Sequence, residues 1–304
     1  MLRLDRFLTL YFFQPLLKLS RVAPEPAIPI LMYHSISDGR EDNVHPYYRV
    51  NTSPGRFAQQ MKFLHNDNYH VISLIKAANI INKPISQLPD QPNIHSTQST
   101  NQPSRYVVLT FDDGYRDFML NAWPVLKEIN YTATVFLPTD FIGETRKVFN
   151  NRECLTWQDV RELHKQGISF GSHTASHPKL HGLRWGDVQR ELLKSRLQIE
   201  DELQSPATCF AYPYAFPQED RAFVLRFAKE VVDQGYRTAV TTVVGRAGLK
   251  SDPLRLERLP VNDGDDEQLF KAKLAGAYDW VAHPQFLARR LKSALRIIRP
   301  VNTE

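Results

Sequence analysis

The chain has 304 residues, of which 42% are hydrophobic and 23% charged, so it can bury one large globular domain. Its net charge of +5 reflects 38 basic and 33 acidic residues, and the clearest basic excess lies at the C-terminal end, away from any groove with interleaved aromatic residues, so we expect no nucleic-acid partner. The two cysteines, Cys154 and Cys209, are too few for a disulfide framework and belong to no metal-binding pair; we expect buried thiols.

Residues 1–26 form an apolar and basic segment. Gln14, Pro15 and Lys18 interrupt its apolar run, which is shorter than the roughly 20 residues of a membrane-spanning helix. Asp5 and the lack of a clean cleavage site argue against a signal peptide, although that alternative stays open. We expect an interfacial or docking helix, which favours a protein in the cytoplasm or peripheral at the cytoplasmic membrane over a secreted one.

Residues 27–283 alternate short apolar runs with amphipathic segments, which predicts one α/β domain. Residues 82–105, rich in Pro, Gln, Ser, Thr and Asn, predict a flexible insertion. Six or more strands, each followed by a helix, favour a barrel over a sandwich, with function at the C-terminal strand ends. The expected strands cover 28–34, 69–73, 106–111, 132–137, 167–172, 207–213, 236–242 and 254–261, and the expected helices cover 53–67 (with Ser53 as N-cap), 74–81, 116–129, 157–166, 185–204 and 218–233.

Residues 284–304 predict a basic amphipathic C-terminal helix. Leucine, isoleucine and alanine recur there at helical spacing beside arginine and lysine, and no acidic residue occurs between positions 286 and 300. Contact with anionic lipid and capping of the domain are both open for this helix.

Three short stretches at predicted strand ends carry the residues suited to chemistry. "LTFDDGY" places Asp112 and Asp113 after a buried strand, and "GSHTASHP" supplies His173 and His177 after another. Two histidines four residues apart share one face if the segment turns helically, so both imidazoles can reach one cation. Two histidines and one carboxylate form a three-ligand site with open positions for water and substrate.

The second aspartate then has a separate task. Adjacent side chains on an extended backbone point in opposite directions, so one carboxylate can bind the metal while its neighbour accepts a proton from water. The aromatic stretch "FAYPYAFP" (210–217) follows another predicted strand. Its backbone amides can stabilise an oxyanion and its rings can stack on sugars, although a core role is equally open for Tyr115, Trp157, Tyr212 and Tyr214.

"TFDDG", "SHTASHP" and "FAYPY" resemble the first three motifs of the polysaccharide deacetylases, the NodB-homology family of carbohydrate esterases, and together they span residues 109–215. The resemblance implies a distorted (β/α) barrel and metal-dependent removal of acetyl groups from polysaccharides, commonly with zinc. It implies Asp112 as general base and Asp113, His173 and His177 as metal ligands. The backbone amide of Tyr214 would be part of the oxyanion hole.

"PILMYHSIS", with the segment from Tyr48 to Leu74, resembles the branch that includes the biofilm poly-N-acetylglucosamine deacetylases. In that branch the barrel is circularly permuted, and the catalytic-acid histidine lies near the start of the chain. The resemblance therefore implies His34 as the general acid. The implied substrate is an acetylated glycan or glycolipid precursor.

Two positions depart from the family pattern. Ala215 stands where a glycine usually follows "YPY", and Thr208 and Cys209 occupy the region of an arginine that the family commonly has. Arg258 is a candidate to replace that arginine beside Asp112, and a structural salt bridge is an equal alternative. These departures keep open a catalytically weak or inactive carbohydrate-binding protein of a membrane-associated synthesis system. The ligand set also fits a non-haem iron oxygenase, but an adjacent second carboxylate suits hydrolysis better.

Overall fold

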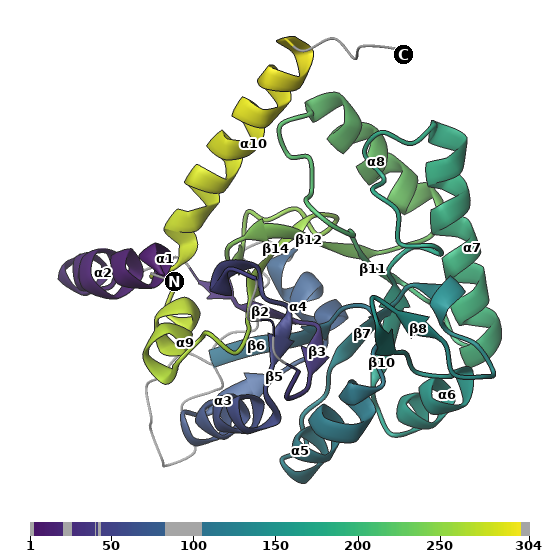
Figure 1. Ribbon diagram of the computed structural model, residues 1–304, viewed down its shortest axis with the longest axis horizontal. Helices are drawn as coiled ribbons and strands as arrows, with labels where there is room; N and C mark the ends of the chain where they lie inside the picture. The colour runs from purple at the N-terminus through teal and green to yellow at the C-terminus, as the bar shows by residue number, and fades with distance from the viewer. Residues whose placement is uncertain (1–2, 21–25, 40, 42–43, 83–104, 299–304) are drawn as a thin grey trace, which may run out of the picture.

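The computed structural model describes residues 3–20, 26–39, 41, 44–82 and 105–298. The expected insertion at 82–105 lies almost wholly outside the described residues and stays a prediction, as does the division into three segments. Figure 1 shows helices packed around a central group of strands, as the alternating pattern predicts.

The central strands are parallel and close into a barrel. They follow the order β2, β14, β12, β11, β10, β7 and β6, and β6 pairs back with β2. The (β/α) barrel expected from the sequence is therefore confirmed. The bounds of these strands are β2 Ile30–Tyr33, β6 Arg105–Phe111, β7 Thr134–Leu137, β10 Ser169–Ser172, β11 Cys209–Ala211, β12 Thr238–Val244 and β14 Leu256–Pro260.

Two irregularities distort the barrel. The register between β12 and β14 shifts between Val240 and Val244, which bends this side of the sheet. The first half of β6 pairs with the short strand β5 (Tyr69–Val71), whereas its second half pairs with β2.

Helices cover the outside of the barrel, and their apolar faces form the core with the strands. Val107, Leu109, Phe111, Val135 and Leu137 are buried on β6 and β7, as their continuous apolar runs predict. The helices are α1 Leu4–Leu8, α2 Gln14–Leu19, α3 Pro54–Asn66, α4 Leu74–Ile81, α5 Trp123–Glu128, α6 Trp157–Lys165, α7 Trp185–Leu203, α8 Arg221–Asp233, α9 Glu267–Leu274 and α10 Ala282–Ile298.

Short paired segments at the strand ends were not predicted from the sequence. They have two residues each, which is too short for a periodic pattern. They are β1 Ala27–Ile28 with β13 Ala247–Gly248, β3 Ser35–Ile36 with β4 Asn51–Thr52, and β8 Val148–Phe149 with β9 Arg152–Glu153. The prediction that Cys154 and Cys209 are free and buried is confirmed.

Candidate metal and catalytic site

The two aspartates leave β6 at the C-terminal end of the barrel, and both are buried. The Asp112 amide donates to the Tyr33 carbonyl oxygen at 3.0 Å, which continues the pairing of β6 with β2. Asp113 then adopts a left-handed φ of 71°, so the two carboxylates take different directions. Gly114 follows with φ 60°, and a Cβ there would lie 2.8 Å from Leu137 Cδ2. The left-handed backbone therefore favours glycine here, and a larger residue would also have to displace the buried Leu137 side chain.

Asp113, His173 and His177 meet in one cluster. Asp113 Oδ1 lies 3.6 Å from His173 Nε2 and 3.4 Å from His177 Nε2, and the two imidazole nitrogens are 3.2 Å apart. One ligand atom from each residue lies within 4.8 Å of the other two. The structure thus brings together the three residues expected from the sequence to bind a metal.

The segment between the two histidines is not helical, which corrects the expectation that a helical turn brings them onto one face. Thr174 and His177 both have left-handed φ values, of 68° and 55°. Glu191 of α7 holds this loop, because its carboxylate accepts from the backbone amides of Ala175 at 2.9 Å and Ser176 at 2.8 Å. Sequence reasoning missed Glu191, since nothing in its helical surroundings distinguishes it from a solvated acid.

The donor set fits a divalent metal ion. His173 Nδ1 lies 2.8 Å from the Ala211 carbonyl oxygen, which fixes the tautomer and leaves the Nε2 lone pair facing Asp113. Burial, together with the neighbouring His173, lowers the pKa of His177 to about 3, so its imidazole is neutral at pH 7. Asp113 Oδ1 is buried and accepts no hydrogen bond from the described residues. A buried carboxylate oxygen without a donor, beside two imidazole nitrogens, is the kind of donor set that a divalent cation requires.

Asp112 is paired with Arg258, the residue that the sequence suggested as a replacement for the family's missing arginine. Arg258 donates from Nη1 to Asp112 Oδ1 at 2.7 Å and from Nη2 to Oδ2 at 2.8 Å, and both side chains are buried. Burial alone would raise the pKa of Asp112, but the charge and hydrogen bonds of Arg258 outweigh it and hold the pKa well below its usual range. Asp112 is therefore a carboxylate at any physiological pH.

His34 lies beside the same carboxylate. The register of β2 and β6 sets Tyr33 opposite Phe111, so the next residue of each strand, His34 and Asp112, reach the same rim. His34 Nε2 lies 3.8 Å from Asp112 Oδ2, and about a fifth of the His34 side chain is exposed (19%). A residue near the start of the chain thus reaches the mouth of the site.

Tyr214 is the exposed aromatic residue of the site. Its φ is 57°, its ring lies 4.7 Å from the His177 ring, and 47% of the residue is exposed. The left-handed conformation falls on Tyr214 and not on Ala215, which explains why alanine is accepted there. Tyr115, Trp157 and Tyr212 are buried, so for them the core alternative is correct.

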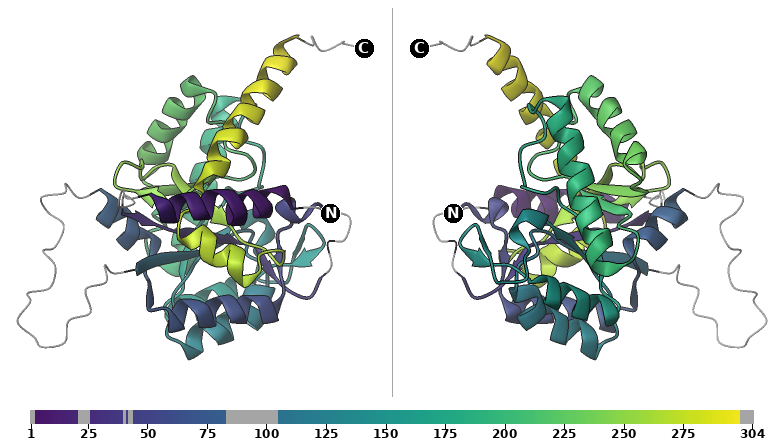
Figure 2. Two further views of the ribbon diagram at one scale, coloured as in Figure 1. Left: turned by 90° about the vertical axis from the view of Figure 1, so that its left-hand side faces the viewer. Right: turned by 90° about the vertical axis from the view of Figure 1, so that its right-hand side faces the viewer.

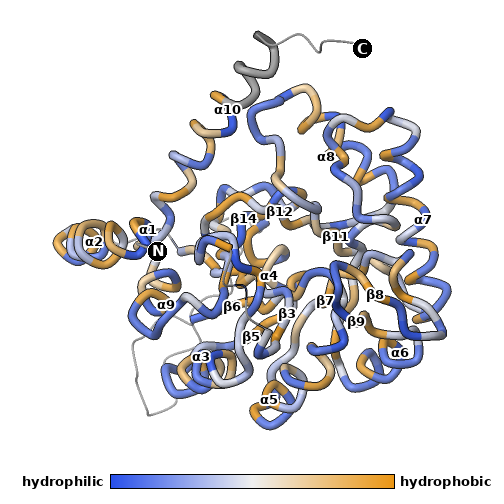
Figure 3. Tube along the Cα trace, viewed as in Figure 1, coloured by the Kyte–Doolittle hydropathy of each residue, from blue (hydrophilic) through white to orange (hydrophobic). Residues whose placement is uncertain are grey.

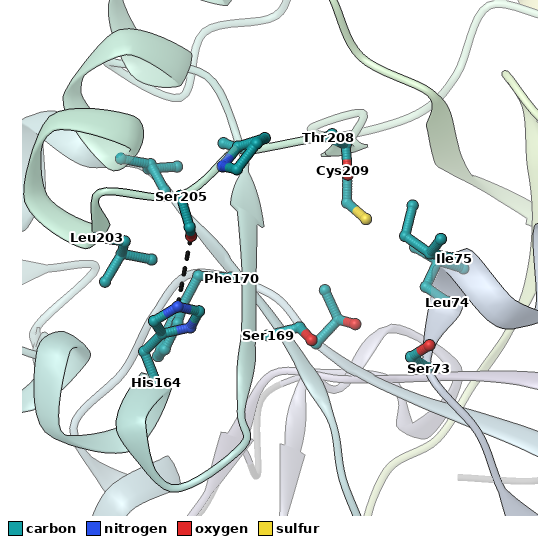
Figure 4. A pocket seen from close by; sticks show the side chains of 14 residues that line it. Ser73, Leu74, Ile75, His164, Ser169, Phe170, Leu203, Ser205, Thr208 and Cys209 are labelled. Atoms are coloured by element: carbon teal, nitrogen blue, oxygen red, sulfur yellow. Dashed lines mark hydrogen bonds between the residues drawn. The ribbon is translucent and has the colours of Figure 1, made fainter.

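A small cavity of about 110 Å³ lies at the opposite end of the barrel (Figure 4). Ser169 and Cys209, which begin β10 and β11, line it together with His164 and Ser205. The Ser205 hydroxyl lies 3.4 Å from His164 Nε2, and His164 Nδ1 lies 3.2 Å from the Ile168 carbonyl oxygen. This cavity is separated from the aspartates by the length of the strands and contributes nothing to their site.

Residues 99–237, which contain the aspartates, both histidines and Tyr214, match the polysaccharide deacetylase family. YxkH of Bacillus subtilis, which is named as a polysaccharide deacetylase, is 29% identical over 245 residues, covering 81% of this chain and 75% of YxkH. The poly-β-1,6-N-acetyl-D-glucosamine N-deacetylase of Staphylococcus epidermidis is 28% identical over 181 residues. That match covers 56% of this chain and only 59% of the staphylococcal enzyme.

Solved structures share the fold. The deacetylase PplD of Streptococcus pyogenes, solved with acetate, superposes with a TM-score of 0.66 at 23% identity, covering 83% of this chain and 99% of PplD. IcaB from Ammonifex degensii gives a TM-score of 0.63 at 18% identity, covering 85% of this chain and all of IcaB (100%). Residues 99–237 thus match the polysaccharide deacetylase family, and the family resemblance expected from the three motifs is confirmed.

Proposed function

We propose that the protein is a metal-dependent hydrolase that removes N-acetyl groups from N-acetylhexosamine units of a polysaccharide or glycolipid precursor. The observation that carries the proposal is the pairing of two adjacent carboxylates with different partners. Asp113 faces His173 and His177, whereas Asp112 is held by Arg258. The named activity of the staphylococcal relative supports an N-acetylglucosamine polymer as the substrate class.

Asp113, His173 and His177 would hold the metal ion, for which we propose zinc. The bound ion supplies Lewis acidity, which acidifies water and polarises an acetamido carbonyl, and a base as weak as Asp112 needs such help. Asp112 Oδ2 faces this space, since it lies 4.0 Å from His173 Nε2. Both Asp112 oxygens accept from Arg258, so the carboxylate is fixed in one orientation.

The residues around Asp112 divide the proton transfers. Asp112 accepts a proton from the attacking water while the water oxygen bonds to the acetamido carbon. The Tyr214 amide would donate to the negative charge that develops on the carbonyl oxygen. His34, in its protonated form, donates to the amine nitrogen as the carbon–nitrogen bond breaks, so that acetate and a free amino sugar leave.

The experiment combines metal content with acetate release. We expect about one zinc or similar ion per chain in the wild type by elemental analysis, and acetate release from a poly-β-1,6-N-acetylglucosamine oligomer. Asp113→Ala should lose both the metal and the activity. Asp112→Asn should keep the metal and lose activity by at least about a hundredfold, because it removes the base and leaves the three ligands in place.

Asp233→Ala is the matched control, because Asp233 is an exposed carboxylate paired with Lys229 on α8 and should leave both readouts unchanged. Acetate release that survives Asp113→Ala would rule out the assigned ligand set. Glycan binding without turnover on any acetylated sugar would instead support the carbohydrate-binding alternative. The inactive alternative rested in part on the arginine that is missing from the region of Thr208 and Cys209. Arg258 weakens this argument, because it supplies a cation beside Asp112 from another strand.

A further inference from the structure

The N-terminal helical segment, residues 4–19, turns its polar groups toward the barrel. The Asp5 carboxylate accepts from the Tyr278 hydroxyl at 2.9 Å, and the Thr9 hydroxyl accepts from Trp280 Nε1 at 3.0 Å. Phe13 stacks on Trp280 with 4.8 Å between ring centroids. The segment is therefore docked on the protein by its inward face, as one of the sequence alternatives predicts.

The outward face of the same segment is apolar. Its exposed hydrophobic residues, which we call the N-terminal stripe, are between 38% and 79% exposed and recur three and four residues apart: Leu4, Phe7, Tyr11, Phe12, Leu16, Leu17 and Leu19. Removing one such side chain from water is worth about 1.5–3 kcal/mol. A stripe of seven is more than a monomeric surface usually carries in one place, which indicates that a partner covers it.

Helix α10 adds a second exposed face of similar character. Leu287 and Leu291 lie one turn apart and are 58% and 65% exposed. The sequence of α10 has no acidic residue and four basic ones: Arg289, Arg290, Lys292 and Arg296. Figures 1 and 2 place α10 on the same side of the molecule as α1 and α2, and Figure 3 shows hydrophobic residues along both helical segments.

The charges decide which partner fits. Asp5 is the one acidic residue between positions 4 and 19, and it faces inward, where Arg3 and Tyr278 bind it. Arg3 and Arg6 are engaged by Asp265 and Asp266. The outward surface therefore combines the apolar stripe with the exposed basic residues Lys18 and Arg290. In a two-fold dimer the same basic helices would face each other, which costs electrostatic energy. Within the described residues no helix is long and apolar enough to span a bilayer.

We propose that the N-terminal stripe and α10 dock the protein on the surface of an anionic phospholipid bilayer. Apolar side chains would enter the headgroup region, while lysine and arginine bind the lipid phosphates. Both helices attach at the end of the barrel that carries the site. Arg3 donates to the Gly264 carbonyl oxygen at 2.8 Å just beyond β14, and Arg289 donates to the carbonyl oxygen of Phe216, close to Tyr214. Docking therefore holds the rim of the site near the bilayer.

Co-sedimentation of the full chain with vesicles tests this proposal. We expect the wild type to pellet with vesicles of equal parts phosphatidylcholine and phosphatidylglycerol, and less so in high salt or with phosphatidylcholine alone. The combined substitution Leu4→Ser, Phe7→Ser, Tyr11→Ser and Leu16→Ser should lower partitioning at least about tenfold. Because these side chains are exposed, the melting temperature should stay close to that of the wild type.

The matched control is Leu225→Ser with Val232→Ser on α8, two residues of similar exposure on another side of the molecule, and it should pellet like the wild type. A wild type that stays in the supernatant with anionic vesicles would overturn the proposal, as would a stripe variant that pellets undiminished. A wild-type dimer that the stripe variant converts to a monomer, without vesicle binding by either, would assign the stripe to self-association instead. Acetate release is not measured, so the result is independent of the proposed activity.

Discussion

At the residue scale, Arg258 has the largest lowering effect on the pKa of Asp112. Its Nε donates to the Thr241 carbonyl oxygen at 2.9 Å and its Nη1 also reaches Thr110 Oγ1 at 3.2 Å, so the guanidinium is fixed by groups other than Asp112. The ion pair is buried and held by several hydrogen bonds, the arrangement in which removing one partner is most costly. Arg258 therefore both orients Asp112 and keeps it ionised.

We expect Arg258→Gln to raise the pKa of Asp112, because burial remains and the opposing cation is gone. The acid limb of the activity profile should move to higher pH, and the unfolding free energy should fall by about 3–5 kcal/mol. Acetate release against pH and urea unfolding measure the two effects. Arg255→Gln, which removes a half-exposed arginine paired with Asp252, is the control and should change neither. An unshifted acid limb in Arg258→Gln would contradict the assignment of Asp112 as base.

At the element scale, long regular elements were predicted well and their ends less so. The helix expected at 157–166 is α6, Trp157–Lys165, and it begins with a capping box that Thr156 and Asp159 form. Ser53 does precede α3, but its hydroxyl donates to Asp263 at 2.5 Å and caps no helix amide. The sequence can predict where a helix begins, whereas the hydrogen-bond partner of the residue at that position depends on which loop lies nearby.

Asp159 links α6 to the pH dependence of stability. Burial raises its pKa, but hydrogen bonds from Thr156 and Arg146 outweigh burial, so the folded-state pKa lies below the ordinary value of 3.8. Its contribution is therefore complete above that value and is lost as pH falls through the folded-state pKa. We expect Asp159→Asn to lower the unfolding free energy by about 1 kcal/mol at neutral pH.

The difference between Asp159→Asn and the wild type should shrink as the pH is lowered below 3.8, where the wild-type carboxylate also loses its charge. Urea unfolding at neutral pH and in acid measures it. Asp233→Asn, at the exposed end of α8, is the control. A difference that stays constant over this range would mean that the charge of Asp159 does not stabilise α6.

At the scale of the whole molecule, a buried ion pair joins distant parts of the chain. Lys273 of α9 donates to Asp265 Oδ2 and to the Pro260 carbonyl oxygen, both at 2.6 Å. Arg3 of the N-terminal segment donates to the other oxygen of Asp265 at 3.1 Å. The end of β14, α9 and the N-terminal segment are thus tied together beside the rim of the site.

We expect Lys273→Met to lower the unfolding free energy by about 3–5 kcal/mol, because it leaves Asp265 buried with Arg3 as its remaining cation. Lys271→Met is the matched control two residues away, since Lys271 is exposed and pairs with Glu267, and it should change stability by less than about 0.5 kcal/mol. Urea unfolding compares the two. If Lys273→Met and Lys271→Met unfold at the same urea concentration, the buried pair does not hold the N-terminal segment.

Much of this protein could be derived from the sequence by itself. Continuous apolar runs identified the barrel strands, because a strand buried on both faces needs such a run whatever surrounds it. The pair Asp112–Asp113 and the spacing of His173 and His177 predicted a cluster that could hold a divalent ion, because few side chains bind such an ion and these stand at strand ends. These features are local, so they survive without knowledge of the fold.

Other features were decided only by the tertiary structure, because they depend on segments that meet far apart in the chain. Arg258 reaches Asp112 across 146 positions, a pairing that becomes visible only when β14 is placed in the barrel. Glu191, which holds the loop between the two histidines, gave no signal at all. Barrel closure brings β2 against β6 and so sets His34 beside Asp112. Strand order is a property of the closed sheet, and no single stretch of sequence contains it.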